Sequence, residues 1–541
     1  MVDYWRFRHN EAALRGRAID SLRSPGNERT AHKGMKKIKR ILLTGGGTAG
    51  HVNPALAIGS ALADKETSFL FVGVRGKVEE MVVPREGIPI KYVRASGFSS
   101  GLSLKMAGFV LNLAAGILQS LAILLRFRPD VIVGTGAYVS APIIMAAAFL
   151  RKLRLLDTRV YLHEQNAVPG KLNRLMGRFA DRVLVTFPET VPFFPERSRL
   201  VGYPLRKRVT RISREEARAK VDLPVPEGRK VVLVFGGSQG SRVINRAIVD
   251  ALGRLRACAD RLFIVHGVGL FRGREYDALS DTEQRLRRRY SEEELRELET
   301  FYACRPFFYN IEYFYSLSDL VVARAGAGSL NEISAMGLPA LIIPKSNLPG
   351  DHQIMNARSM ERTGGAEIVY EQVSPVDGRL EEWIDGNVLA EKIIDMLADD
   401  DRLREMGMRG GSFLNHDALE RISRVIHGKE DGDAVGAGVR EETARIPGNR
   451  ALLSMLEKAH QKQQSKYSPE QVVSRRQDLD CFRSRAGALL LHTAWQQRNL
   501  GVKLLGLLHA HEKIPALLAL FNDRTRVSLL KRLCGGDFEQ V

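Results

Sequence analysis

The fold is indicated by a stretch near the start of the chain, ILLTGGGTAGH (residues 41–51), in which an apolar run leads into glycines and then into a helix-like sequence. The same order recurs in VVLVFGGSQG (residues 231–240). Glycines after a strand let the backbone approach an anion, and the N–H groups at the start of the next helix point towards it. We therefore predict two similar α/β lobes that face each other across a cleft and hold two substrates.

Short apolar runs rich in β-branched residues alternate with helical stretches around both turns. Such runs occupy residues 68–72, 130–133, 159–162, 261–265, 320–322 and 340–343. This alternation is typical of a parallel sheet covered by helices. The predicted fold class is α/β.

The chain of 541 residues is too long for one hydrophobic core, so several domains are expected. The predicted parts are an N-terminal extension without structure (1–38), a first lobe (39–205), a second lobe (206–428), a linker (429–448) and a helical extension of unknown role (449–541). The first part is charged and lacks the apolar core of a signal peptide. Met1 and Met35 are both candidate translation starts.

Charge and cysteine content narrow the class of protein. The formal net charge of +19 favours anionic partners, whether nucleic acid, an anionic membrane surface or phosphorylated substrates, and does not choose among them. The four cysteines are far apart and form no C-x-x-C pair, so neither a zinc site nor a disulfide framework is indicated. A reducing cytosol fits this pattern best.

His51 follows the first glycine turn and is a candidate general base. We expect Asn53 to cap, and Pro54 to open, a helix that runs to Leu62. A histidine beside the positive end of that helix would be neutral at pH 7 and could accept a proton. The alternative is a histidine that only bonds the loop backbone.

The glycine spacing in this first turn has a second interpretation. Gly45, Gly47 and Gly50 also satisfy the G-x-G-x-x-G pattern of dinucleotide-binding proteins. No acidic residue closes the next strand, residues 69–72, where such proteins bind the ribose.

A third glycine turn, RAGAGSLNE (residues 324–332), follows the predicted strand at 320–322. Ser329 and Glu332 match a helix capping box. Glu332 could instead accept both hydroxyls of a ribose while the loop amides meet phosphates, and the two interpretations partly coexist. Arg206 is a candidate for positive charge between the lobes, with a plain surface arginine as the alternative.

Two charged stretches favour structural interpretations. Asp399-Asp400-Asp401 resembles a metal-binding D-x-D but joins apolar positions without a flanking strand, which predicts the start of a helix. Residues 274–299 predict a solvated helix capped by Ser291.

Residues 106–125 carry no charge and are about long enough to span a bilayer. Small and polar residues recur at helical spacing among large apolar ones, so we predict one or two helices partly packed on the first lobe, with exposed side chains dipping into a membrane. Lys105, Arg126 and Arg128 would meet anionic headgroups. A transmembrane helix and plain core burial are the alternatives.

Several blocks, taken in order, resemble the bacterial MurG family. They are GGTAGH (46–51), HEQN (163–166), GGSQG (236–240), residues 324–339, DHQ (351–353) and NA (356–357). The resemblance covers residues 39–428. It implies a GT-B fold of two Rossmann-like lobes, the first for a lipid acceptor and the second for a UDP-sugar, with inverting transfer of N-acetylglucosamine from UDP onto undecaprenyl-pyrophosphoryl-muramyl-pentapeptide (lipid I) for peptidoglycan synthesis.

The resemblance also implies roles for individual residues. Glu332 would bind the ribose, Arg206 the diphosphate, and Tyr309 would lie near the uracil, while His51 is our choice of base. The further residues expected to contact UDP-N-acetylglucosamine are Thr48, Ala49, Gly50, Asn166, Ser238, Ala327, Gly328, Ser329, His352 and Gln353. The chain departs from the family at Tyr203, where asparagine is usual, and at Gly328, where a bulkier residue is usual.

The same resemblance implies a peripheral protein on the cytoplasmic face of the inner membrane, with an anionic membrane surface as partner, and without cofactor, metal ion or nucleic acid. Two other hypotheses are a GT-B transferase with another glycolipid acceptor, and a scaffold that recruits cell-wall or division proteins through its C-terminal helices.

Overall fold

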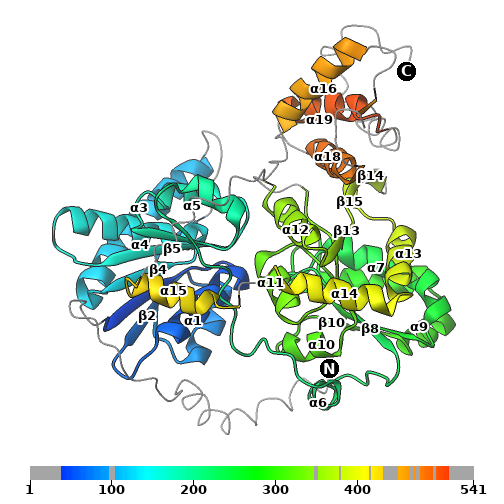
Figure 1. Cartoon of the computed structure of the whole chain (residues 1–541), viewed down its shortest axis with the longest axis horizontal. Coiled ribbons are helices and arrows are strands. Elements are labelled where there is room, and N and C mark those ends of the chain that lie inside the picture. Colours follow the sequence, from blue (N-terminus) through cyan, green and yellow to red (C-terminus); the bar gives the residue numbers. More distant parts are fainter. Residues whose placement is uncertain are drawn as a thin grey trace. The chain divides into compact units, whose positions relative to one another are not determined.

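A computed structural model of the chain is shown in Figure 1. It describes residues 38–96, 104–346, 351–376, 379–413, 416–429, 449–463, 468–469, 476–491 and 495–510. The N-terminal extension up to residue 37 and the linker from residue 430 lie outside these ranges. The chain forms two compact units, the first containing residues up to Val209 and a returning segment after residue 413, the second containing Thr210–Phe413 and the C-terminal helices.

The first unit is built on a seven-stranded parallel sheet of order β3-β2-β1-β4-β5-β6-β7. Its strands are β1 (Arg40–Thr44), β2 (Ser68–Gly73), β3 (Ile90–Tyr92), β4 (Val131–Gly134), β5 (Arg159–Glu164), β6 (Arg182–Val185) and β7 (Ser198–Leu200). Its helices are α1 (Ala49–Leu62), α2 (Val78–Val82), η3 (Pro84–Glu86), α3 (Leu104–Phe127), α4 (Ala137–Lys152), α5 (Lys171–Met176), η4 (Pro188–Phe193) and α15 (Ala418–Ile426).

Both faces of this sheet are buried, as the continuous apolar runs predict. Successive side chains of a strand point to opposite faces. Ile41 and Leu43 of β1 therefore enter one apolar cluster and Leu42 enters another. Helices cover the sheet on both faces, which leaves the loops at the strand ends to form a binding surface.

The second unit repeats this plan with a six-stranded parallel sheet of order β10-β9-β8-β11-β12-β13. Its strands are β8 (Lys230–Phe235), β9 (Leu262–Gly267), β10 (Tyr302–Arg305), β11 (Leu320–Ala323), β12 (Ala340–Ile342) and β13 (Ala366–Ile368). Its helices are α6 (Arg214–Lys220), α7 (Arg242–Leu255), η5 (Arg256–Cys258), α8 (Ala278–Arg289), α9 (Glu292–Glu299), α10 (Ile311–Leu317), α11 (Ala327–Ala335), α12 (His352–Arg362), α13 (Gly386–Leu397) and α14 (Asp400–Gly411). The α/β prediction is confirmed in both halves.

The helical character predicted for the C-terminal extension is also confirmed. Its described helices are α16 (Asn449–Gln463), α18 (Arg476–Leu489) and α19 (Trp495–Leu507). They form an apolar cluster of their own around Leu456, Phe482 and Leu504. An antiparallel hairpin of β14 (Gln372–Val376) and β15 (Arg379–Trp383) lies beside α18 (Figure 1).

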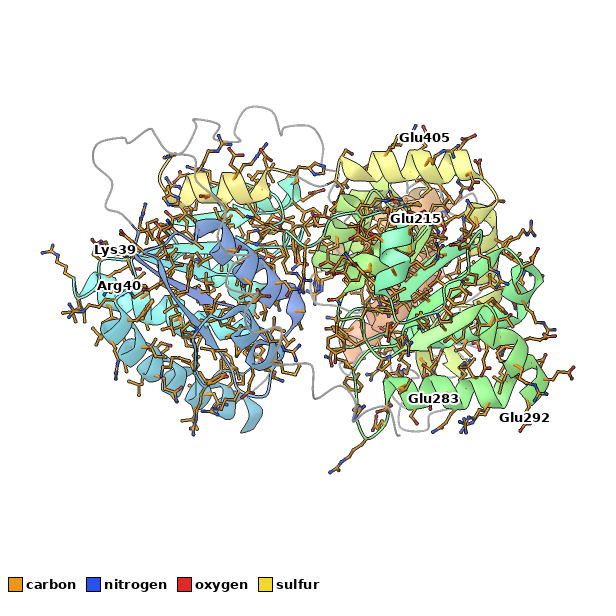
Figure 2. All side chains as sticks on the ribbon, turned by 90° about the horizontal axis from the view of Figure 1, so that it is seen from below. Lys39, Arg40, Glu215, Glu283, Glu292 and Glu405 are labelled. Atoms are coloured by element: carbon orange, nitrogen blue, oxygen red, sulfur yellow. The ribbon has the colours of Figure 1, made fainter. Side chains whose placement is uncertain are left out.

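The charged stretches have the predicted structural roles. Where one helix was predicted over residues 274–299, two form: α8, capped by Asp277, and α9, capped by Ser291 in a capping box with Glu294. Glu283 and Glu292 lie on the outer surface of the unit (Figure 2). Asp399 caps α14 by accepting a hydrogen bond from the Arg402 N–H at 2.9 Å, so the acidic run starts a helix.

Helix α3 packs on the first unit through one face. At Gly116 an added Cβ would lie 2.1 Å from the Arg94 carbonyl oxygen, and the Arg94 N–H donates to Gln119 at 2.7 Å. The face that carries Gly116 therefore points towards the lobe, while the opposite face exposes Leu111 and Leu118. Residues 108–127 are long and apolar enough to cross a membrane, and 17% of the most apolar window is buried. This partial packing of α3 on the first lobe agrees with the prediction made from residues 106–125. The side chain of Lys105 lies outside the described residues.

Helix α15 shows where the observed units differ from the predicted lobes. Its Ile422 and Ile426 are fully buried in the cluster that contains Ile41 and Leu43 of β1. The Tyr161 hydroxyl also donates to the Ile426 carbonyl at 3.2 Å. The α/β part of the second unit therefore ends at Phe413, whereas the predicted second lobe continued to residue 428.

We predict that Ile422→Ala lowers the unfolding free energy of the first lobe by about 2–5 kcal/mol, because it leaves a cavity under the sheet. Urea unfolding monitored by circular dichroism measures this change. Glu420→Ala, at an exposed position of the same helix, is the matched control and should stay within about 0.5 kcal/mol of wild type. Equal effects of the two substitutions would show that α15 is not part of this core.

Candidate active site

Both sheets reverse their winding direction at the strand that carries a glycine turn. The chain moves from β1 outwards to β3 and then returns to place β4 on the other side of β1, and β8 and β11 have the same relation. In open parallel sheets, ligands bind beyond the carboxyl ends of the strands at such a reversal. Residues 45–50 follow β1 and residues 236–240 follow β8, so each unit presents its turn at that point.

The first turn can be formed only by glycine. A Cβ on Gly45 would lie 2.0 Å from Thr135 Oγ1, and Gly47 has a φ of +83°. The carboxylate of Glu79, which is fully buried, accepts hydrogen bonds from the N–H groups of Gly47 at 3.0 Å and Val74 at 3.1 Å. Glu79 therefore holds the first glycine turn in place through a buried carboxylate that joins it to the end of β2. Sequence analysis missed it, because a glutamate in a short helix carries no signal of burial.

The structure corrects the predicted start of the helix after this turn. Helix α1 begins at Ala49 with Thr48 as N-cap, so Asn53 is not the cap and Pro54 lies inside the helix. The N–H groups of His51 and Val52 already donate to the Thr48 carbonyl, which starts the helix one turn earlier. His51 is thus in the first turn of α1 rather than before it.

The ring of His51 has a defined orientation and tautomer. Its Nδ1 lies 2.9 Å from the carbonyl oxygen of Thr135, at the end of β4. A carbonyl only accepts, so Nδ1 carries the proton and Nε2 is the basic atom of the neutral ring. Gln165 Nε2 donates to the same carbonyl at 2.7 Å, and Thr135 Oγ1 donates to the His51 carbonyl at 2.6 Å. These bonds fix the histidine against two strands.

The block at residues 163–166 positions Asn166 at the same sheet edge. Glu164, buried at the end of β5, accepts from the backbone N–H of Asn166 at 2.9 Å, from its Nδ2 at 3.2 Å, and from Asn173 Nδ2 at 2.7 Å. Burial raises the pKa of Glu164, while these hydrogen bonds lower it. Asn166 itself is half-buried. The supporting role of Asn173, seven residues beyond a family motif, was not visible in the sequence.

In the second unit, the turn after β8 is again restricted to glycine. Gly237 and Gly240 have φ values of +91° and +77°, and a Cβ on Gly240 would lie 1.9 Å from the Val268 carbonyl oxygen. Ser238 is half-buried on this turn, and its carbonyl accepts from the Leu270 N–H at 3.0 Å. Helix α7 then starts with Ser241 as its N-cap.

The third glycine turn opens α11 and contradicts the capping-box interpretation. Helix α11 begins at Ala327 with Gly326 as N-cap, so Ser329 is already inside the first turn. The backbone N–H groups of Ala327, Gly328 and Ser329 are those that a helix N-terminus offers to an anion. Glu332 is half-buried and accepts a hydrogen bond from the hydroxyl of Tyr315 at 3.2 Å.

Arg324 connects the two turns of this unit, and sequence analysis did not assign it a role. Its Nε and Nη2 donate to Ser241 Oγ at 3.0 and 2.6 Å, and its Nη1 donates to the Ile343 carbonyl at 3.1 Å. It also forms an ion pair of 2.5 Å with the buried carboxylate of Glu371. One guanidinium therefore holds together the ends of β8, β11 and β12.

The remaining predicted residues lie in the loops of their own units. Gln353 Oε1 accepts from the Lys345 N–H at 3.0 Å, which places it beside the end of β12, and His352 is the first residue of α12. Tyr309 follows β10 and is exposed, with its ring edge-to-face against Phe307. Arg206 is half-buried in the segment after β7.

Comparison with known proteins assigns the family. Residues 41–185 match the glycosyltransferase family 28 N-terminal domain, and residues 231–406 match the family 28 C-terminal domain. The UDP-N-acetylglucosamine–N-acetylmuramyl-(pentapeptide) pyrophosphoryl-undecaprenol N-acetylglucosamine transferase of Halothermothrix orenii is 35% identical over 374 residues, 68% of this chain and 92% of that protein. The chain belongs to this transferase family. The Moorella thermoacetica member is 36% identical over 392 residues, 72% of this chain and 98% of that protein.

A crystal structure of Acinetobacter baumannii MurG has the same fold, with a TM-score of 0.52 and 23% identity over 72% of this chain and 99% of that one. The predicted GT-B class and the resemblance to the MurG family are confirmed. The chain is accordingly a glycosyltransferase. The matched domains end at residue 406, before the C-terminal helices.

His163 provides a prediction about pH. It is fully buried, its Nε2 donates to the Gly202 carbonyl at 3.2 Å, and burial lowers its pKa from 6.5 to about 4. The unfolded chain therefore takes up this proton first as the pH falls, so the stability contributed by neutral His163 is present above pH 6.5 and is lost between pH 6.5 and about 4.

The measurement is an NMR titration of ¹³C-labelled histidine rings, with His163 assigned by the resonance missing in His163→Gln. The His163 ring should remain neutral at pH 5, where free histidine added as a reference is protonated. A His163 ring that becomes charged above pH 6 would contradict the assigned burial.

Proposed function

We propose that the protein transfers N-acetylglucosamine from UDP-N-acetylglucosamine to the 4-hydroxyl of the muramyl residue of lipid I, with inversion at C1, and so forms lipid II. The observation that carries this proposal is the match to transferases named for this reaction, which spans both lobes and more than nine tenths of the two relatives cited above. The glycine turns at both sheet reversals support it, because a nucleotide diphosphate and a lipid pyrophosphate are both anions that such turns bind.

The second lobe would bind the donor. Glu332 would accept the two ribose hydroxyls, and the hydroxyl of Tyr315, which donates to Glu332 Oε2, would keep the carboxylate in position. The N–H groups at the start of α11 and the turn containing Ser238 would contact the diphosphate and the sugar. Tyr309 would lie near the uracil. Gln353 already uses its carbonyl oxygen within the lobe, so it would donate to the sugar through Nε2.

The first lobe would supply the base, with Asn166 holding the donor sugar. The muramyl 4-hydroxyl oxygen forms a bond to C1 as the bond from C1 to the UDP oxygen breaks, and the hydroxyl proton passes to His51 Nε2. The developing imidazolium is stabilised by the Nδ1–H bond to the Thr135 carbonyl. Negative charge grows on the departing diphosphate, where Arg206 and the oriented helix N-termini would stabilise it.

Helix α3 supports a peripheral location on the cytoplasmic face of the inner membrane. Its exposed face carries an apolar stripe at helical spacing, consisting of Leu111, Ala114, Leu118, Ala122 and Leu125. Arg126 and Arg128 are exposed at its end, where anionic headgroups would attract them. A lipid acceptor is delivered at such a surface.

We predict that His51→Ala lowers kcat by about 10²-fold or more, because it removes the proton acceptor. Glu332→Ala should mainly raise the KM for UDP-N-acetylglucosamine. Transfer from labelled UDP-N-acetylglucosamine to a lipid I analogue measures both, with alternative glycolipid acceptors in parallel. His427→Ala, a half-buried histidine at the C-cap of α15, is the matched control and should retain turnover. A loss below about tenfold for His51→Ala would remove it from the base role.

We predict that Leu111→Gln combined with Leu118→Gln weakens binding to vesicles containing phosphatidylglycerol by at least about tenfold, because apolar area that enters the membrane is lost. Vesicle sedimentation measures this, and circular dichroism checks the fold. Met408→Gln, an exposed apolar residue of the second unit, is the control. Vesicle binding equal to wild type in the double variant would rule out α3 as the contact surface.

A further inference from the structure

The C-terminal helices are integrated into the second unit through an apolar core. Val373 of β14 is 2% exposed and belongs to the same cluster as Leu456, Phe482 and Leu504 of the extension. Helix α18 lies along β14 (Figure 1). The described part of the extension therefore completes its core with a residue of the lobe that carries the donor-site residues.

Two adjacent residues of α18 contact both flanks of one segment of that lobe. Ser484 Oγ lies 2.6 Å from Ser346 Oγ and donates to the Glu371 carbonyl at 2.5 Å. Arg485 Nη2 lies 3.1 Å from Asp351 Oδ2. Residues 346 and 351 are the described ends of the segment that follows β12 and leads directly into His352 and Gln353.

The contact between Arg485 and Asp351 joins a buried guanidinium to a half-buried carboxylate. The Arg485 side chain is 3% exposed, and its guanidinium also lies over the Phe482 ring at 5.8 Å. Asp351 has a φ of +51°, a left-handed conformation that non-glycine residues adopt at a cost. It is the N-cap residue of α12, yet its side chain forms no capping hydrogen bond. The backbone at Asp351 is thus held with its carboxylate directed at the extension.

Electrostatics favours the same arrangement. Burial raises the pKa of Asp351, while the charges of Arg485 and His352 lower it. Loss of Arg485 would leave a half-buried carboxylate without its main cationic partner, and such a group moves towards solvent or takes up a proton. Either response would displace the residues that follow Asp351.

A second connection runs from the extension towards the glycine turn. Ser484 binds the backbone of Glu371, and the Glu371 carboxylate accepts from the Ser346 N–H at 3.2 Å and pairs with Arg324. Arg324 in turn donates to Ser241, the N-cap of α7. Ser484 is thus connected through Glu371 and Arg324 to the N-cap of α7, and Arg485 contacts the residue that precedes His352.

We propose that the C-terminal extension is a working part of the donor site, in which Arg485 is a positioning residue that holds Asp351 and thereby sets the place of His352 and Gln353 against the sugar of the donor. This inference rests on the proposed function. It assigns the extension a role in UDP-sugar binding by the same chain instead of the recruitment of another protein.

The test uses the full-length protein and compares Arg485→Met with Arg483→Met. Arg483 lies two residues before Arg485, on the opposite side of the same helix. It donates to the carbonyls of Leu508 at 2.9 Å and His509 at 3.1 Å, so its loss perturbs the extension alone. Calorimetry measures binding of UDP and of UDP-N-acetylglucosamine, and the transfer assay gives KM for donor and for the lipid I analogue.

We expect Arg485→Met to weaken UDP-N-acetylglucosamine binding by about tenfold and to raise the donor KM accordingly, while UDP binding and the acceptor KM change by less than about threefold. Arg483→Met should leave all four values near wild type. Asp351→Asn should give the same selective loss, and the double variant should lose no more than the worse single one, because both act through one contact.

The outcomes separate the two proposals. If wild type binds neither UDP nor the UDP-sugar at millimolar concentration, the proposed function fails. If wild type binds both and Arg485→Met matches wild type, or loses no more than Arg483→Met, the positioning role alone fails. If circular dichroism shows that Arg485→Met is unfolded, Asp351→Asn becomes the deciding variant. An unchanged affinity of Asp351→Asn for the UDP-sugar would then overturn the positioning role of Arg485.

Discussion

The site depends on one steric constraint, which is the absence of Cβ atoms at two glycine turns. Thr135 Oγ1 occupies the space of a Cβ at Gly45, and the Val268 carbonyl occupies that of a Cβ at Gly240. Because these neighbours approach so closely, the backbone turns sharply enough for a helix to start directly behind each strand. The N–H groups at those helix starts are then available to a bound anion.

Buried charged groups keep the turns in place. Glu79 accepts from the Gly47 N–H of the first turn, Glu164 accepts from Asn166, and Arg324 joins the N-cap of α7 to the end of β12. A charge without solvent is costly unless its hydrogen bonds are satisfied, so each group fits one arrangement of its neighbours. The proposed site is therefore ordered by residues that its ligands would not need to contact, and substrate binding would not have to supply the free energy of that ordering.

The sequence predicts the sheets well because β-branched runs bounded by glycine are a local signal. It fails where the deciding contact is distant. Pro54 suggested a helix start, but Thr48 already accepts the first helical hydrogen bonds. Ser329 and Glu332 have the spacing of a capping box, yet Gly326 begins the helix and Tyr315 binds the glutamate. The amphipathic pattern of α15 predicts that one of its faces is buried, but it does not predict which of the two units that face packs against.

The same reasoning applies to the extension. The spacing of its apolar residues predicts helices, but it does not predict the surface on which those helices pack. The family domains end at residue 406, so the fold of the two lobes can be described without it. In this chain, however, Val373 is buried by the extension, and Arg358 forms an ion pair with Asp478 of α18. A tethered recruitment module would need neither a shared core nor buried polar contacts with the lobe. Groups buried together in this way lose stability together, so α18 and the lobe residues that it contacts, among them Val373 and Arg358, constitute one structural unit.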